Sequence, residues 1–392
     1  MTAKLHAAVI GGGAAGMATA LELARQGARV TVLEADALGS GSSGRSVGVV
    51  GTQMTDPFQL LMRRYGQARF REWEGQGFRF NHIGYLRLAR TPAQMRALEE
   101  SQRMQEEAGF RARVLTPEEM VQLIPHLSVE GLAGGIFGPD DGFLDPYELC
   151  TFLGARLREQ GGEIRQFCKV TGVARRSGGY RLETTKGGLD CDVVVNAAGA
   201  WAPKVAAMFG QELHIFPERH EAMAILLDQP LDYTMPMVMD LIDGQGTGLN
   251  FRHEKPNELI SEIHKVSTGT FADPDDYNDQ CMDASREYLA ELLLERLPDL
   301  PGARLGRGWA GLYPITADHK PFAGPVDPSE PGLITAGGGG GYGIQLSPVI
   351  GIAAADWALH GAVVSAPGLE ALRPSPDRNR PVSAAANHEE QH

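Results

Sequence analysis

The sequence lacks the features that mark nucleic-acid-binding, membrane-spanning and secreted proteins. Its 392 residues carry 36 Lys and Arg against 49 Asp and Glu, a formal net charge of −13, and contain no basic block. Because phosphate binding needs concentrated positive charge, nucleic acid and anionic membranes are disfavoured as partners. No apolar run approaches the roughly 18 residues of a membrane span, and the apolar start is too short for a signal peptide. We therefore expect a cytoplasmic protein without a transmembrane segment.

Cysteine is scarce, and no CxxC pair or other ligand-like spacing is present. We expect reduced, mostly buried thiols and no structural metal. The four cysteines are Cys150, Cys168, Cys191 and Cys281. With 43% hydrophobic and 22% charged residues, the chain has enough apolar sequence for a large core and for two lobes.

The first recognisable unit runs from Leu5 to Glu34. Here "LHAAVI" predicts a buried strand, "AAGMATALELARQG" a helix and "ARVTVLE" a second strand. The intervening pattern Gly11-x-Gly13-x-x-Gly16 permits a tight turn and the approach of a pyrophosphate to the helix N-terminus. Glu34 is placed to accept hydrogen bonds from an adenosine ribose, which a purely structural turn would not explain. The unit predicts dinucleotide binding, and the motif alone fits NAD and FAD equally.

A pyridine-nucleotide dehydrogenase would use a second dinucleotide-binding unit for NAD(P)H, and we expect none here. The loop "GSGSSGRSVGVVG" that follows the first unit gathers hydroxyl groups, a cation and exposed backbone N–H groups. We expect it to contact the cofactor, a flexible surface loop being the alternative. Its candidate residues are Ser42, Ser43, Arg45 and Ser46.

Glycine is concentrated near the end of the chain, in "GGGGYGIQLSP". A strand-like "GLITA" precedes this stretch and an amphipathic helix follows it, so a low-complexity linker is disfavoured. So many glycines are costly to order, which indicates that something lies close against this backbone.

Two segments carry a family resemblance. One is the strand end "NAAGAW", and the other is the block "GRGWAGLYPITADHKPFAGP" with the strand, glycine turn and helix that follow it. With these segments the chain resembles the FAD-dependent amino acid and amine oxidoreductases, the family of D-amino acid, glycine and sarcosine oxidases. The similarity spans Leu5 to about Gly361, and "DGFLDPYEL" also matches.

The resemblance implies an α/β fold, with a Rossmann-like FAD-binding domain of the glutathione-reductase type and a second α+β substrate domain on an antiparallel sheet. The glycine turn would lie against the flavin, and a helix beginning near Tyr342 to Gln345 would point its N–H groups at the ring. Val170 would offer its backbone to the adenine, although an ordinary core valine is equally consistent. The implied FAD contacts are Gly11, Gly13, Ala14, Ala15, Gly16, Glu34, Ala35, Ser42, Ser43, Arg45, Ser46, Val170, Ala198, Gly199, Trp201, Gly340, Gly341, Tyr342, Gly343, Ile344 and Gln345.

The implied chemistry is hydride transfer from the carbon beside an amine to flavin N5, giving an imine that water hydrolyses. Since the flavin carries the hard step, no Ser/His/Asp triad is needed, and none is convincing. The loop after the first unit carries Arg45 where covalent relatives have a histidine or cysteine, so we expect non-covalent FAD. The alternative is an FAD-bearing subunit of a heteromeric dehydrogenase with little activity alone. Oxygen or another acceptor, and homo- or hetero-oligomers, are left open.

A substrate carboxylate would call for an arginine fork helped by a tyrosine hydroxyl. Arg219 and Arg252 stand beside aromatic residues in strand-like sequence, and Tyr313 and Lys320 flank the flavin-side motif. For each of them, a solvated or strand-edge role is the alternative.

The predicted domains are discontinuous. Residues 1–85, 142–212 and 305–365 are assigned to the FAD-binding domain and residues 86–141 and 213–304 to the substrate domain. Because residues 366–392 are rich in Pro, Ala and charge, we expect a flexible tail there.

Overall fold

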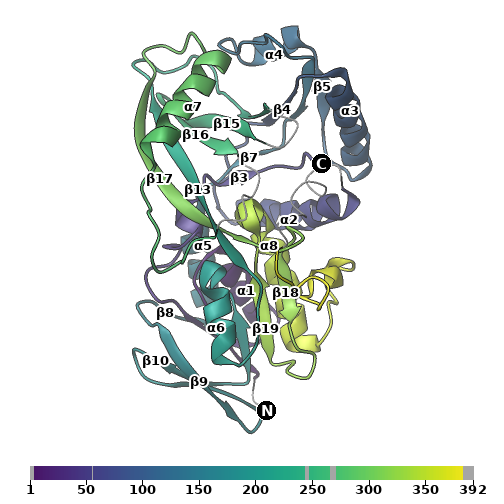
Figure 1. Ribbon diagram of the computed structural model, residues 1–392. Coiled ribbons are helices and arrows are strands. Elements are labelled where there is room, and N and C mark those ends of the chain that lie inside the picture. Colours follow the sequence, from purple (N-terminus) through teal and green to yellow (C-terminus); the bar gives the residue numbers. More distant parts are fainter. Residues whose placement is uncertain (1–3, 55, 243–246, 265–270, 383–392) are drawn as a thin grey trace.

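The computed structural model describes residues 4–54, 56–242, 247–264 and 271–382. Two sheets organise this part of the chain, and Figure 1 shows them in opposite halves of an elongated molecule. The long strands β13 and β17 run from one half toward the other. The predicted fold class, a Rossmann-like domain with a second α+β domain, is confirmed.

The first sheet has the strand order β18-β19-β12-β1-β2-β8. Strand β18 runs antiparallel to β19, and the other neighbours are parallel. The bounds are β1 (His6–Ile10), β2 (Arg29–Leu33), β8 (Glu163–Arg165), β12 (Val193–Asn196), β18 (Phe322–Pro325) and β19 (Leu333–Gly337). Strand β1 is apolar after His6 because helices and other elements cover both faces of a parallel sheet. The strand–helix–strand unit predicted for residues 5–34 is present.

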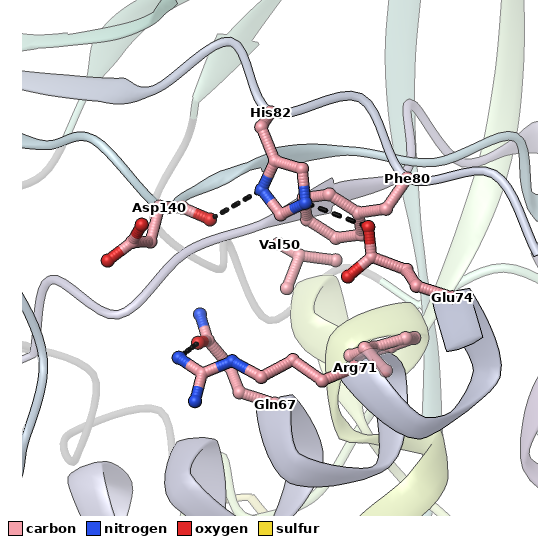
Figure 2. A pocket seen from close by; sticks show the side chains of 8 residues that line it. Val50, Gln67, Arg71, Glu74, Phe80, His82 and Asp140 are labelled. Carbon is pink, nitrogen blue, oxygen red and sulfur yellow. Dashed lines mark hydrogen bonds and ion pairs between the residues drawn. The ribbon is translucent and has the colours of Figure 1, made fainter.

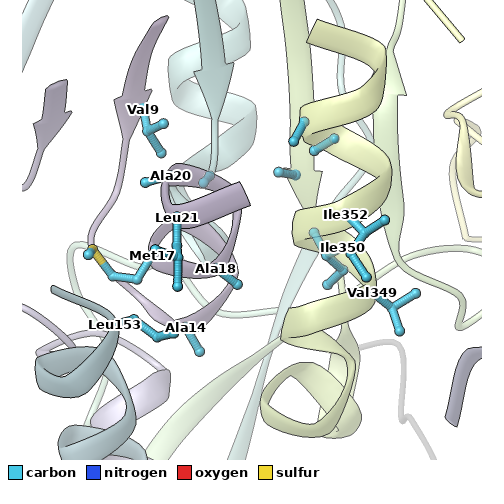
Figure 3. Packing of buried hydrophobic residues seen from close by; sticks show 14 of the residues in the cluster. Val9, Ala14, Met17, Ala18, Ala20, Leu21, Leu153, Val349, Ile350 and Ile352 are labelled. Atoms are coloured by element: carbon cyan, nitrogen blue, oxygen red, sulfur yellow. The ribbon is translucent and has the colours of Figure 1, made fainter. Parts of the chain in front are cut away.

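Helices α1 (Ala14–Arg25), α5 (Pro146–Glu159) and α8 (Gly343–His360) build the core beside this sheet. Helices α1 and α8 lie side by side, with Met17 and Leu21 facing this core from α1 and Ile350 from α8 (Figure 3). A Cβ on Gly351 would lie 2.8 Å from the backbone of Ala18, so a glycine is needed where the two helices meet.

The second sheet, called the large sheet below, has the order β17-β13-β16-β15-β14-β4-β6-β5. Its neighbours are antiparallel except for β14 and β4, which are parallel. The bounds are β4 (Tyr85–Ala89), β5 (Arg113–Leu115), β6 (Gly134–Gly138), β13 (Phe216–Leu226), β14 (Met237–Leu241), β15 (Gly248–Lys255), β16 (Glu258–His264) and β17 (Arg304–Ile315). One face packs Val238, Leu249 and Leu259 against Leu289 and Leu293 of helix α7 (Asp283–Arg296). Alternate residues therefore project from the opposite face.

The remaining elements connect or cover the two sheets. They are α2 (Pro57–Gly75), α3 (Pro92–Glu107), α4 (Pro117–Leu123), α6 (Ala202–Met208), η1 (Ser43–Arg45), η2 (Gly199–Trp201), η3 (Gly340–Tyr342), η4 (Leu369–Leu372), the pair β3 (Val49–Val50) and β7 (Gly142–Phe143), and the sheet of β9 (Val170–Arg176), β10 (Gly179–Thr184) and β11 (Leu189–Cys191). Asp56 caps α2 by accepting from the backbone N–H of Gln59, and Pro57 occupies the first turn, where its missing N–H is harmless.

A surface hollow lies beside α2 and is bordered by Val50 of β3 and by Phe80, His82 and Asp140 (Figure 2). In it the ring nitrogens of His82 meet the carboxylate of Glu74 at 2.8 Å and the carbonyl oxygen of Asp140 at 3.2 Å. Arg71 approaches Gln67 in the same hollow.

The C-terminal segment corrects one expectation. Ala366, Leu369 and Leu372 are fully buried in the core of the first sheet, and the Arg378 guanidinium donates to the carboxylate of Asp318 at 2.6 Å. Residues 366–382 are thus packed rather than a flexible tail, because three apolar side chains and one arginine anchor a polar sequence. Residues 383–392 lie outside the described part of the chain.

The predicted domain boundaries stay predictions. Strand β17 belongs to the large sheet although residues 305–315 are assigned from the sequence to the FAD-binding domain. Cys150, Cys168 and Cys191 are buried free thiols, and Cys281 is half-buried. Within the described residues, none of the helices is both long and apolar enough to cross a membrane.

Candidate active site

The glycines of the first turn bring the end of β1 against the start of α1. Gly11 has a φ of +112°, and a Cβ there would lie 2.4 Å from the carbonyl oxygen of Ala197. A Cβ on Gly16 would lie 2.1 Å from the carbonyl oxygen of Gly11. Neither position admits a side chain unless the backbone moves. The turn therefore stays tight, and the first N–H groups of α1, which begins with Ala14 and Ala15, face the loop without helical partners.

Glu34 lies at the carboxyl end of β2, against this turn. One carboxylate oxygen accepts from the backbone N–H of Gly12 at 2.6 Å, and the other accepts from the backbone N–H of Asp36 at 2.8 Å. The next residue, Ala35, is exposed. A carboxylate held at this point can accept hydrogen bonds from a ribose.

The loop that carries Ser42, Ser43, Arg45 and Ser46, called the serine loop below, lies on the α1 N-terminus. The Ser43 hydroxyl accepts from the Ala14 N–H at 3.0 Å, which is the position an anion would take at a helix N-terminus. Arg45 donates to the carbonyl oxygen of Gly41 at 3.2 Å, and its own carbonyl oxygen accepts from the Trp309 ring at 2.8 Å. Ser42 and Ser46 flank the short η1 turn. The loop is therefore ordered by the large sheet.

The residues predicted for the adenine side lie near the strand ends of the first sheet. Val170 begins β9 and is buried, whereas Gly199 has a φ of +55° and nothing within 4 Å of an added Cβ. Ala198 precedes η2, and the Trp201 ring nitrogen donates to Asp275 at 2.7 Å. A Cβ on Gly41 would lie 3.7 Å from the Trp201 ring, so this tryptophan borders the serine loop.

The second glycine turn leads from β19 through η3 into α8, where the sequence predicts a helix start. A Cβ on Gly340 or Gly343 would meet open space, whereas a Cβ on Gly341 would lie 2.8 Å from the Tyr313 ring. Ile344 and Gln345 are buried in the first turn of α8. The Gln345 side chain accepts from the Gly51 N–H at 3.0 Å, which joins this turn to the segment after β3.

Together these elements fit an FAD. The turn at α1 offers helix N–H groups to the pyrophosphate, and Glu34 offers a carboxylate to the ribose. The open space at Gly340 and Gly343 leaves room for a flat ring beside the N-terminus of α8.

The face of the large sheet opposite α7 presents a polar group to this second turn. Tyr313 pairs with Glu218 across β17 and β13, and its hydroxyl lies 3.5 Å from a carboxylate oxygen of Glu262 on β16. The other oxygen of Glu262 accepts from the Asn250 amide at 3.0 Å. Burial, with the neighbouring Glu262, raises the pKa of Tyr313 well above its usual value, so the phenol stays protonated. The amide oxygen of Asn250 is buried without a hydrogen-bond partner.

The residues predicted to bind the substrate do not all lie on the same face of the large sheet. Tyr313 lies beside the glycine turn. Arg252 is buried on the same face, with its guanidinium 3.7 Å from the Phe143 ring centroid, and both Nε and Nη2 donate to the carbonyl oxygen of Val47. Lys320 lies 5.6 Å from the ring of Phe58 at the start of α2.

Arg219 points away from this group. Its Nε donates to the carbonyl oxygen of Asn278 at 2.7 Å, its Nη2 donates to that of Gln280, and its Nη1 pairs with Glu221. A substrate role for Arg219 stays a prediction, which these contacts disfavour.

Sequence reasoning missed three buried polar residues near the second turn. Gln53 is 2% exposed with an unpartnered amide oxygen, and Arg63 is 3% exposed with two unpartnered nitrogens. Asp141 is fully buried and accepts from the Thr52 hydroxyl at 3.0 Å, and burial raises its pKa to about 7. The sequence signal for Arg63 was only its place beside Met62 and one turn before Gly66 in a helical segment, and its burial is seen in the structure.

The surface hollow of Figure 2 is a weaker candidate for a catalytic site. His82 is exposed and already pairs with Glu74, and Asp140 pairs with Arg111. The two carboxylates of the hollow, Glu74 and Asp140, therefore already have partners.

Comparison with known proteins gives a family and relatives. The family described as "DAO: FAD dependent oxidoreductase" matches residues 6–357. Glycine oxidase of Geobacillus kaustophilus is 27% identical over 366 residues, which cover 91% of this chain and 93% of that protein. Mitochondrial dimethylglycine dehydrogenase of Homo sapiens is 27% identical over 379 residues, covering 91% of this chain but 43% of the longer relative.

Two solved structures have the same fold as this chain. L-proline dehydrogenase from P. horikoshii superposes with a TM-score of 0.84 at 27% identity, covering 95% of this chain and 98% of the other. Glycine oxidase from Geobacillus kaustophilus gives a TM-score of 0.75 at 26% identity, covering 91% and 95%.

Proposed function

Because this chain belongs to the DAO family of FAD-dependent oxidoreductases, we propose that it oxidises the C–N bond of a small amino acid, imino acid or secondary amine. Bound FAD supplies the acceptor for the hydride that leaves the carbon beside the nitrogen. Water hydrolyses the C=N bond of the resulting imine to a carbonyl group and an amine or ammonia, which stay in one molecule when the imine is cyclic. We further propose that the FAD is held without a covalent bond, since Arg45 occupies the serine loop.

The observation that carries this proposal is the polar group formed by Tyr313, Glu262 and Asn250 beside the glycine turn. Asn250 has a buried amide oxygen without a partner, and Glu262 is a carboxylate shared between a phenol and an amide. Such acceptors suit the N–H groups of an amine, because an unpaired buried acceptor costs about 1–3 kcal/mol that a ligand donor removes.

The chain's own residues would bind, orient and exclude water. Tyr313 is held by stacking on His220, with ring centroids 3.9 Å apart, so its hydroxyl keeps one direction. Glu262 would favour an amine N–H pointed at the sheet, leaving the carbon free to face the glycine turn. Gln345 fixes that turn through Gly51.

The test is anaerobic reduction of the FAD-loaded protein by glycine, sarcosine, dimethylglycine, L-proline and D-amino acids, followed by flavin absorbance. Bleaching by one class supports amine oxidation and names the class. If none of these amines, nor simple amines without a carboxylate, bleaches the flavin, the chain is better described by the alternative of an FAD-bearing subunit that needs a partner.

A further inference from the structure

Arg63 is a buried arginine whose guanidinium is only partly satisfied. It lies in α2 with 3% of its surface exposed, and its Nη1 donates to the side chain of Gln59 one turn earlier. Its Nε and Nη2 are buried and have no hydrogen-bond partner. An unpaired buried donor on a charged group is costly, so such a pair of N–H groups calls for an acceptor.

The two unpartnered nitrogens form one edge of the guanidinium plane. Nε and Nη2 donate side by side, which is the fork that matches both oxygens of a carboxylate. The protein uses this arrangement elsewhere: in Arg90, Nε and Nη2 donate to the two carboxylate oxygens of Asp240 at 3.0 and 2.8 Å. In Arg63 neither nitrogen of the same edge has a hydrogen-bond partner.

No carboxylate of the described chain fills this edge. Asp141 is hydrogen-bonded to Thr52, and Asp56 caps the start of α2 through Gln59. Burial lowers the pKa of Arg63 to about 10, which still leaves the guanidinium charged at neutral pH. The buried cation therefore lacks the anion that usually accompanies one.

The location of Arg63 connects it with the second glycine turn. Its guanidinium carbon lies 5.1 Å from the ring centroid of Tyr342, the last residue of η3. One turn later in α2, a Cβ on Gly66 would lie 3.1 Å from the carbonyl oxygen of Gln345. The face of α2 that carries Arg63 thus packs against the first turn of α8.

The two arginines predicted from the sequence do not offer this fork. In Arg252 both Nε and Nη2 donate to Val47, and in Arg219 they donate to Asn278 and Gln280. Backbone carbonyl oxygens occupy the edge in both cases.

We propose that Arg63 binds the carboxylate of the substrate through the Nε/Nη2 edge of its guanidinium. This inference rests on the proposed function and narrows it: the substrate is an amino or imino acid, or an N-alkylated amino acid, and not a simple amine. The carboxylate is held from the α2 side of the glycine turn, and the nitrogen faces Asn250 and Glu262 on the large sheet.

Acetate, a carboxylate that cannot reduce the flavin, tests the proposal by binding alone. The FAD-loaded protein is titrated with acetate, and with acetamide as its uncharged counterpart, while the flavin spectrum and the heat of binding are recorded. Arg63→Met and Arg63→Lys are compared with Arg64→Met, which removes an exposed neighbouring arginine of the same helix. FAD content and melting temperature are measured for each variant.

We expect acetate, and not acetamide, to bind the wild-type protein. Arg63→Met should weaken acetate binding at least tenfold, Arg63→Lys should lie between, and Arg64→Met should match wild type. If Arg63→Met does not fold, the Arg63→Lys titration decides, because lysine keeps the charge but lacks the fork. Equal acetate affinity in wild type and the Arg63 variants overturns the proposal.

Two further outcomes separate this proposal from the proposed function. If wild type binds no acetate but its flavin is reduced by amines without a carboxylate, the carboxylate site is wrong and amine oxidation stands. If acetate binding depends on Arg63 but no amine reduces the flavin, the anion site stands and the proposed function fails.

Discussion

The hydroxyl of Tyr313 lies 3.5 Å from a carboxylate oxygen of Glu262, on the face of the large sheet that meets the glycine turn. The two residues are 51 positions apart and are brought together by neighbouring strand pairs, β17 with β13 and β13 with β16. The pairing gives the predicted substrate site a phenol donor and a carboxylate acceptor in one place.

Removal of the Tyr313 hydroxyl alone should slow the reduction of the flavin without disturbing the fold. In Tyr313→Phe the ring can still stack on His220, so FAD content and melting temperature should stay near wild type. Loss of one hydrogen bond worth about 1–2 kcal/mol predicts roughly a tenfold lower rate of anaerobic flavin reduction, measured by stopped flow with the best substrate. Tyr65→Phe, which removes a hydroxyl that donates to Pro367, is the control. An unchanged rate in Tyr313→Phe would show that the Tyr313 hydroxyl has no part in the reaction.

A methyl group at Gly16 should disrupt the cofactor turn. The new Cβ would lie 2.1 Å from the Gly11 carbonyl oxygen, so the start of α1 must move away from β1. We expect Gly16→Ala to purify with little FAD and a lower melting temperature. Gly27→Ala introduces strain at a φ of +93° but has no atom within 4 Å, and should cost about 1 kcal/mol while keeping its FAD. Full FAD content in Gly16→Ala would show that the turn tolerates the shift.

Loss of the Glu34 carboxylate should weaken FAD binding. Glu34→Ala removes the proposed ribose acceptor and frees the Gly12 N–H that it now holds. We expect at least a tenfold increase in the dissociation constant, measured by titrating apoprotein with FAD and following flavin fluorescence. Asp36→Ala, an exposed carboxylate two residues later, is the control and should bind like wild type. Equal affinities in the two variants would contradict a ribose contact.

Asp141 should make stability depend on pH near neutrality. Burial raises its pKa from 3.8 to about 7, so the folded state binds a proton that the unfolded state has released. The contribution of this proton to the free energy of unfolding is complete below the pKa of Asp141 in the unfolded state, and it is lost as the pH rises through the pKa in the folded state. Between pH 5 and pH 7, wild type should therefore lose about 2–3 kcal/mol of unfolding free energy relative to Asp141→Asn, and the difference should then level off.

Urea denaturation of both proteins at several pH values measures this difference. A constant gap from pH 5 to pH 8 would mean that the carboxyl group is already ionised in the folded protein at pH 5. Thr52→Val, which removes the hydroxyl that donates to Asp141, should raise the pKa of Asp141 and move the same transition to higher pH.

Local sequence patterns determined the nucleotide-binding half of the protein. The strand, turn and helix of residues 5–34 and the second glycine turn before α8 are contiguous segments, and each carries its own pattern of apolar and glycine residues. Backbone conformation there is set by neighbouring residues, so sequence alone could indicate it.

The substrate half needed long-range information. From the sequence, Arg219 and Arg252 looked like equivalent arginines on alternating strands. The register of the large sheet decides that Arg219 faces the loop of Asn278 and Gln280, and a one-residue difference in register would have reversed this.

The sequence by itself therefore determined the dinucleotide turn, because that depends on short-range periodicity and glycine geometry. It also indicated the family and the fold class, through the segments that resemble known family members. Only the tertiary structure decided which polar groups are left without partners. The unpartnered nitrogens of Arg63 and the unpartnered amide oxygen of Asn250 belong to segments far apart in the chain. Whether a buried donor or acceptor is satisfied depends on all the atoms packed around it, and no local pattern encodes that environment.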